Sequence, residues 1–316
     1  MDFEVAAVTF RPAAVHILLK HMKRLMTTLL AASLLTACAG VTAPGATRSE
    51  TPQQSLAATK SAMGQLRSAK FDLSGTVHVT LPQALVDQLK AKEGSQAGLI
   101  APDMTVVLKA SGAAQKPDQL QATVSAKLGG LTLNTEVIAT GGKLYYKDPM
   151  TSRWQLLKQA ARTTESKAPG GFSYQAVLDN ASVTEVKDSN STINGMAVDH
   201  YRIVPDLVKL FAAISAGHTG TNAAAISALQ TVLQNATVTA DVWTSSSDHL
   251  VRRASYDADV TADLSQLAGA LSSKAATAKV PALSLPAGSN AHVTAHLVLD
   301  LHDFNSQLKI QAPAVP

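Results

Sequence analysis

The stretch FDLSGTVHV, residues 71–79, is the most informative part of the chain for its fold. Its apolar side chains occupy the odd positions, Phe71, Leu73, Val77 and Val79, and small or polar residues stand between them. Successive side chains of a β-strand point to opposite faces of the sheet. The alternation therefore predicts a strand with one buried face and one face in water.

The same alternation recurs along the chain. It is found over residues 105–109, 119–128, 131–138, 143–146, 182–187, 198–203, 238–244, 251–260 and 292–301. Gly141-Gly142 and Asn194-Gly195 separate neighbouring segments, and both dipeptides are typical of hairpin turns. We expect about ten strands, joined mostly by short turns and therefore paired antiparallel.

Four helices are predicted beside these strands. Thr51 is the expected N-cap of the first, with Pro52 in its first turn and Gln54 closing a capping box, and this helix should run to about Ser68. The other three are expected over residues 81–91, 206–216 and 222–235. No repeat or change of composition divides residues 51–316, so we expect one α+β domain, an antiparallel sheet with helices on one face.

The N-terminal part of the chain resembles a bacterial export signal. From Met22 a basic start is followed by an apolar run that is too short to span a bilayer. Leu35, Thr36 and Ala37 then precede Cys38, the single cysteine of the chain, as in a lipobox. An ordinary thiol in a leader that is cut elsewhere is the alternative.

The lipobox interpretation makes Cys38 a lipid-attachment site. Acyl chains on this residue would anchor the mature protein to the extracytoplasmic face of the cell membrane. Residues 1–37 then comprise a start assigned too early, 1–21, and the signal peptide. Residues 38–50 contain the lipidated cysteine and a flexible linker rich in small residues.

Charge gives no indication of nucleic-acid binding. The net charge of the whole chain is +4, and residues 1–37 hold four basic and two acidic side chains, which leaves +2 for the rest. Basic residues are not clustered with aromatic ones, as phosphate tracking requires. We expect no nucleic-acid partner.

Catalytic motifs are also missing from the sequence. It contains no nucleophile elbow, phosphate-binding loop, dinucleotide fingerprint or HExxH zinc motif, so we predict no enzyme, no catalytic residues and no cofactor. His292 and His296 would lie about 13 Å apart along a strand, too far for one metal ion. Arg252 and Arg253 are either a solvated pair on a strand or a contact for an anionic head group.

Several phrases of the chain resemble a known family. The order of the parts, with SLAATKSAMGQLRSAKFDLSGTVHV (55–79), GGKLYYKDP (141–149), RWQLL (153–157), GMAVDHYRIV (195–204), ADVWTSSSDHLVRRASYDADV (240–260) and DFNSQLKIQAP (303–313), is similar to that of the LppX/LprA/LprF/LprG lipoproteins of actinobacteria. More distantly, it is similar to LolA-like and RseB-like domains.

This resemblance implies a strongly curved antiparallel sheet, a half-barrel, whose concave face is covered by helices and encloses an apolar cavity for acyl chains. It implies a lipid or glycolipid ligand and no catalytic residue. A domain tethered by a short linker would need a partner to move lipid across a wide envelope, for which an envelope transporter is the candidate. The alternation alone supplies candidate cavity residues: Leu73, Val77, Val79, Val124, Leu133, Val137, Tyr201, Ile203, Leu207, Leu210, Phe211 and Ile214. The same alternation would also suit a filled core. The expected function is thus a membrane-anchored lipid carrier or, alternatively, an envelope sensor or protein-interaction module without lipid cargo.

Overall fold

The structure is a computed structural model, and it describes residues 51–93, 100–157, 180–186, 191–215, 223–266 and 285–315. Cys38, the lipobox and the linker lie outside these residues. So do residues 159–172 and most of residues 269–289. In the described part of the chain, no helix is long and apolar enough to cross a bilayer.

The chain forms helices and strands close to the predicted positions. The helices are α2 (Pro52–Gln65), α3 (Gln83–Glu93), α5 (Leu207–Ser215) and α6 (Ala223–Gln234). The strands are β1 (Ser68–Thr80), β2 (Asp103–Gln115), β3 (Gln119–Leu128), β4 (Leu131–Thr140), β5 (Lys143–Lys147), β6 (Trp154–Leu157), β7 (Ala181–Val186), β8 (Thr192–Ile193), β9 (Met196–Pro205), β10 (Thr237–Ser245), β11 (Val251–Asp263) and β12 (Asn290–His302).

Two differences from the prediction have a local cause. Helix α2 begins with the predicted capping box, in which the Thr51 hydroxyl accepts from the Gln54 amide, but it ends at Gln65 because Ser68 already belongs to β1. The short strands β6 and β8 were not among the predicted ten. Strands of two to four residues are too short to show an alternation.

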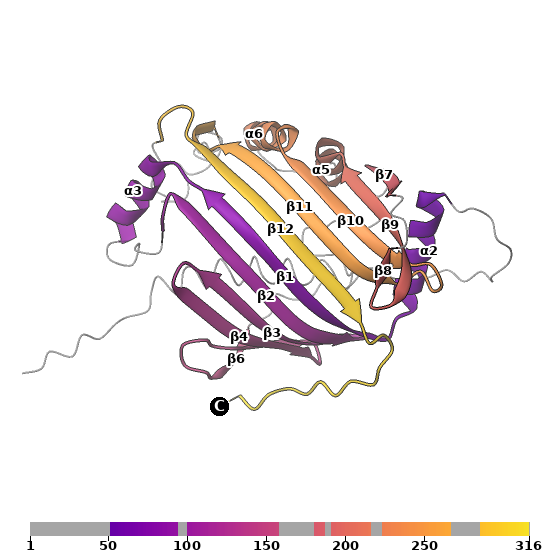
Figure 1. The fold of residues 1–316 in the computed structure, drawn as a ribbon. Coiled ribbons are helices and arrows are strands. Elements are labelled where there is room, and N and C mark those ends of the chain that lie inside the picture. Colours follow the sequence, from indigo (N-terminus) through magenta and orange to yellow (C-terminus); the bar gives the residue numbers. More distant parts are fainter. Residues whose placement is uncertain are drawn as a thin grey trace, which may run out of the picture.

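The strands form one antiparallel sheet. Its order is β6-β5-β4-β3-β2-β1-β12-β11-β10-β9-β7, with β8 paired to β9 beside this path. Strands β1 and β12, from opposite ends of the domain, lie next to each other in the middle of the sheet (Figure 1). The sheet is open, with β6 and β7 at its ends.

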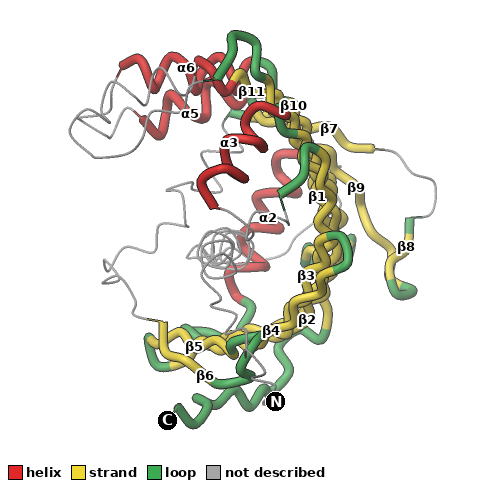
Figure 2. The backbone as a smooth tube through the Cα atoms, turned by 90° about the vertical axis from the view of Figure 1, so that its left-hand side faces the viewer, coloured by secondary structure: helices red, strands yellow, loops and turns green. Residues whose placement is uncertain are grey.

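The sheet is strongly curved, and all four helices lie on its concave side (Figure 2). Residues of α2 contact this side at two places. Leu56 packs with Tyr201 and Ile203, and Met63 packs against the cluster around Phe71. The predicted architecture, a curved antiparallel sheet with helices over the concave face, is confirmed.

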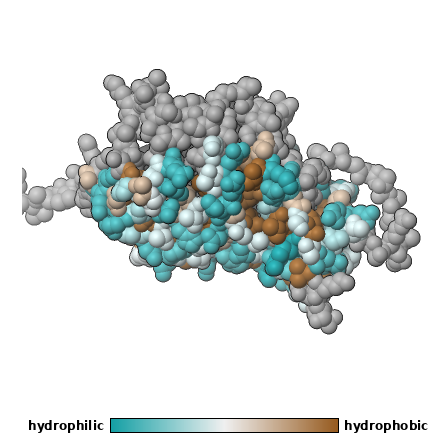
Figure 3. Space-filling model, turned by 90° about the horizontal axis from the view of Figure 1, so that it is seen from above, coloured by the Kyte–Doolittle hydropathy of each residue, from teal (hydrophilic) through white to brown (hydrophobic). Residues whose placement is uncertain are grey.

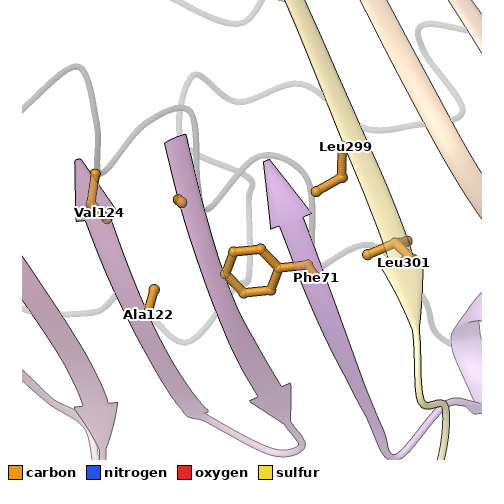
Figure 4. Packing of buried hydrophobic residues seen from close by; sticks show 6 residues of the cluster. Phe71, Ala122, Val124, Leu299 and Leu301 are labelled. Atoms are coloured by element: carbon orange, nitrogen blue, oxygen red, sulfur yellow. The ribbon is translucent and has the colours of Figure 1, made fainter. Parts of the chain in front are cut away.

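The largest hydrophobic cluster lies at the centre of the concave side. It contains Phe71 of β1, Ala110 of β2, Ala122 and Val124 of β3, and Leu299 and Leu301 of β12. Figure 4 shows the Phe71 ring between the side chains from β3 and those from β12. Packing between strands so distant in sequence joins the N-terminal and C-terminal halves of the sheet.

A smaller cluster covers part of the convex side. Ile310 and Leu308 of the C-terminal segment pack against Ile138, Tyr145 and Trp154 of β4 to β6. The Leu308 amide also donates a 3.2 Å hydrogen bond to the side chain of Gln115. The end of the chain is thereby attached to the outside of the sheet.

Candidate functional site: the concave face of the sheet

The pairing register places apolar side chains in continuous rows across the concave face. One row runs through Tyr201, Val242, Ala254, Leu299, Leu73, Ala110, Val124 and Thr135, one residue from each of eight strands. The next runs through Ile203, Ala240, Tyr256, Leu297, Gly75, Leu108, Ala126 and Leu133. The concave face is therefore almost entirely apolar.

The eight strand residues predicted to face a cavity share this face. They are Leu73, Val77, Val79, Val124, Leu133, Val137, Tyr201 and Ile203. Helix α5 adds Leu207, Leu210 and Phe211, of which Leu210 is buried and the other two are half-buried. Ile214 belongs to α5, but its side chain lies outside the described residues.

Burial on the concave face is uneven. Val124, Tyr201 and Ile203 are buried under α2 or in the central cluster. Val77 and Val79, towards the other end of β1, are only half-buried. Near that end of β1, apolar side chains on the concave face of the sheet remain partly accessible.

Polar groups on the concave face mostly have partners. The Tyr201 hydroxyl donates to Ser55 of α2 at 2.9 Å, and the Tyr146 hydroxyl donates to Gln155 at 2.6 Å. The hydroxyl of Thr135 donates to the carbonyl of Lys147 at 2.6 Å. These hydrogen bonds join the face to α2 and connect β4, β5 and β6, so the three hydroxyl protons are already engaged.

Tyr256 of β11 is different. Its side chain is 38 % exposed, although its row neighbours Ala240 and Leu297 are apolar. Loss of surrounding water raises the pKa of the Tyr256 hydroxyl above its ordinary value of 10.0, with no charged group among the causes. Desolvation of this kind disfavours the charged phenolate form of the side chain.

The sequence-based selection of candidate residues missed Tyr256, although its signal was present. Residues 251–260 alternate, and Tyr256 stands in the apolar register with Ala254, Ala258 and Val260. Its face could have been assigned from that alternation alone.

The convex face of β11 and β12 is polar. His292 and His296 of β12 lie 2.8 Å and 2.6 Å from the carboxylates of Asp259 and Asp257, and Arg253 forms a 2.6 Å ion pair with Asp300. Both histidines lie on a strand, as predicted. Among the residues that the structure describes, no three histidine or acidic side chains are grouped so that they could hold a metal ion.

A groove of about 320 Å³ crosses this polar face. Its walls include Thr76, His78, Asp257, Asp259 and His296. The carboxylates in it already contact histidines of the neighbouring strand. Both carboxylates of the groove, Asp257 and Asp259, are therefore paired with histidines of β12.

The two adjacent arginines have different environments. Arg253 lies on the convex face and remains partly exposed beside Asp300. Arg252 is 7 % exposed, lies 2.5 Å from Asp248 and stacks over the ring of Phe304. The prediction of a solvated pair is wrong for Arg252. Neighbouring residues of a strand point to opposite faces, so Arg252 lies on the side of Ala254 and is buried beside Phe304, while Arg253 points to the convex face.

Comparison with known proteins gives matches among solved structures alone. No family model and no curated protein sequence matches the chain. The lipoprotein LppX of Mycobacterium tuberculosis aligns with 82 % of this chain and 98 % of its own, at 12 % identity and a TM-score of 0.38. The chain is similar to LppX.

A second similar structure is a LolA superfamily protein from Nitrosomonas europaea. It aligns with 84 % of this chain and 96 % of its own, at 10 % identity and a TM-score of 0.21. LppX and this LolA superfamily protein belong to the two groups that the sequence resembles. At these TM-scores the backbones of the two proteins superimpose on this chain only in part.

Proposed function

We propose that this protein is a membrane-anchored lipoprotein that binds the acyl chains of a lipid or glycolipid against its concave face. It carries them within or across the cell envelope. One observation supports this proposal above the others: an apolar face that spans eight strands keeps partly accessible side chains, including Val77 and Val79, on the inside of a curved sheet.

The energetics favour acyl chains as the occupant. Burial of a methylene group contributes about 0.8 kcal/mol, so a chain of sixteen carbons gains roughly 12 kcal/mol before the costs of binding. Straight chains also need few polar contacts, and the concave face offers few. A lipid tail thus suits this surface better than a polar metabolite does.

Helices α5 and α6 contribute further apolar surface at one edge of the concave side. Leu229 of α6 is 38 % exposed, and Leu207 and Val208 of α5 are half-buried. Seen from above, hydrophobic patches lie between hydrophilic side chains (Figure 3). A lipid that enters or leaves over this edge would pass apolar side chains.

Anchoring through Cys38 determines how such a carrier would work. A flexible linker of about 12 residues spans about 20 Å on average, so the domain would stay close to its membrane. Transfer over a longer distance then requires a partner, which we propose to be an envelope transporter. Incorporation of labelled palmitate in a bacterial host tests the anchor: Cys38→Ser should abolish it, and persistent labelling would show that Cys38 is not the attachment site.

Native mass spectrometry with lipid extraction tests the cargo. Residues 51–316, secreted from a bacterial host without Cys38, should carry one diacyl or triacyl lipid per chain. A clean mass of the protein alone, unchanged after incubation with lipids, would contradict the carrier function. That result would favour the alternative, an envelope sensor or protein-interaction module.

A further inference from the structure

Tyr256 differs from the other tyrosines of the concave face. Three tyrosines occupy this face in the described part of the chain, and two of them, Tyr146 and Tyr201, donate hydrogen bonds to side chains of the protein. Among the residues that the structure describes, none forms a hydrogen bond with the Tyr256 hydroxyl. Tyr256 is also the most accessible of the three, at 38 %.

The surroundings of Tyr256 offer no acceptor from neighbouring strands. It lies opposite Ala240 of β10 and Leu297 of β12. Along its own strand, the same face shows Ala254 and Ala258. None of these four apolar side chains can accept a hydrogen bond from the phenol.

The environment of this hydroxyl is also partly dehydrated. Desolvation alone accounts for the raised pKa of Tyr256. A polar group removed from water without a partner is costly, and a ligand that supplies an acceptor recovers that cost. Alanine, valine or leucine, which occupy the other positions around it, would avoid the cost entirely.

We propose that the Tyr256 hydroxyl donates a hydrogen bond to the ester carbonyl of a bound acyl lipid and so selects acyl esters over ligands that are purely hydrocarbon. This inference rests on the proposed lipid-binding function and names the chemical class of its ligand. The hydrocarbon chains lie along the apolar rows, where they need no polar contact. The carbonyl is the strong acceptor that an acyl ester has beside its chains. The hydroxyls of Thr59 and Thr244 also have no partner but are fully buried, so Tyr256 is the accessible donor among them.

A matched pair of lipids distinguishes recognition of the ester carbonyl by Tyr256 from lipid binding in general. Dipalmitoylglycerol has two ester carbonyls, and dihexadecylglycerol has the same chain length and free hydroxyl but ether oxygens, which are weaker acceptors. Binding of both to the full-length protein is measured by titration with a fluorescent fatty-acid competitor. Tyr256→Phe should weaken binding of the diester by about 2- to 12-fold, the contribution of one hydrogen bond, and leave the diether unchanged.

Tyr145→Phe is the control variant. The Tyr145 ring packs with Ile138 and Ile310 on the convex side, so its loss should leave the ester preference intact. If the wild-type protein binds neither lipid, the proposed function itself is wrong. If it binds both, and Tyr256→Phe binds both equally well or loses both equally while keeping its circular dichroism spectrum, the role of Tyr256 is overturned and lipid binding stands.

Discussion

Phe71 of β1 lies directly opposite Gly112 of β2, and the ring occupies the space that a side chain at position 112 would need. A methyl group at Gly112 would come 2.8 Å from Phe71 Cζ and still closer to the backbone oxygen of Gln121. The absent side chain thus lets the largest ring of the central cluster lie flat across two strands. The contact between Phe71 and Gly112 thus packs the central hydrophobic cluster against β2, in the middle of the sheet.

Gly112→Ala should therefore destabilise the fold. Both contacts are closer than van der Waals packing allows, and one of them is to backbone, which moves only with its strand. We expect the free energy of unfolding in urea to fall by about 2 kcal/mol. Gly130→Ala is the matched control, since nothing lies within 4 Å of its new methyl group, and its effect should stay within about 0.5 kcal/mol.

Leu56→Ala tests the contact of α2 with the concave face. Leu56 is 0 % exposed and packs against Tyr201 and Ile203, so truncation leaves a cavity between helix and sheet. The loss should be about 2–5 kcal/mol, measured as above. The same truncation at Leu156, which is 47 % exposed on β6, should cost far less, and equal losses would contradict the packing described.

Val77→Glu probes the binding function. Val77 is half-buried on the concave face, so a carboxylate there would have to be buried against any acyl chain. We expect binding of lipid to fall by at least tenfold. Ser74→Glu places the same charge on the exposed convex face of the same strand, opposite Lys109, and should leave lipid binding as in the wild-type protein.

Alkaline pH should weaken the fold through Tyr256. Desolvation raises its pKa above the 10.0 of an ordinary tyrosine. Its contribution to the free energy of unfolding is therefore fully present below pH 10 and is lost as the pH rises through the raised pKa. Tyr256→Phe should show a smaller loss of unfolding free energy between about pH 10 and 12. An ultraviolet titration of tyrosinate should lose a late component in the same variant, and identical curves would argue against a desolvated hydroxyl.

Acidic pH should lower the free energy of unfolding through protonation of Asp303. A hydrogen bond from Lys70, at 2.7 Å, lowers the pKa of this carboxyl below 3.8, so its contribution is present above that value and is lost as the pH falls through the lowered pKa. Asp303→Asn should flatten the dependence of stability on pH between about 4 and 2. Asparagine suits the positive φ of this position, and Lys70→Gln should reproduce the effect by removing the partner.

The faces of the strands could be read from the sequence. Phe71, Leu73, Val77 and Val79 were placed together by alternation, and the structure keeps all four on the concave side. The capping box at Thr51 was equally local. Both depend on geometry within a few residues, where the pleat of a strand or the first turn of a helix leaves little choice.

Individual environments needed more than alternation. Arg252 is enclosed because Asp248 and the ring of Phe304 lie against it, and Phe304 comes from a segment far away in the sequence. The free hydroxyl of Tyr256 was also hidden from sequence reasoning. Its neighbours Ala240 and Leu297 come from other strands, so its lack of an acceptor depends on which strands lie beside β11.

The sequence by itself thus determined the elements, their caps and the side of the sheet that each apolar residue faces. Tertiary structure decided that β1 pairs with β12, that the sheet stays open at β6 and β7, and that its curved inner side is covered unevenly by helices. The physical reason is the separation in sequence between the residues that interact. Alternation is set by the backbone of one strand, whereas strand order and curvature depend on packing between segments more than two hundred residues apart, such as Phe71 and Leu301.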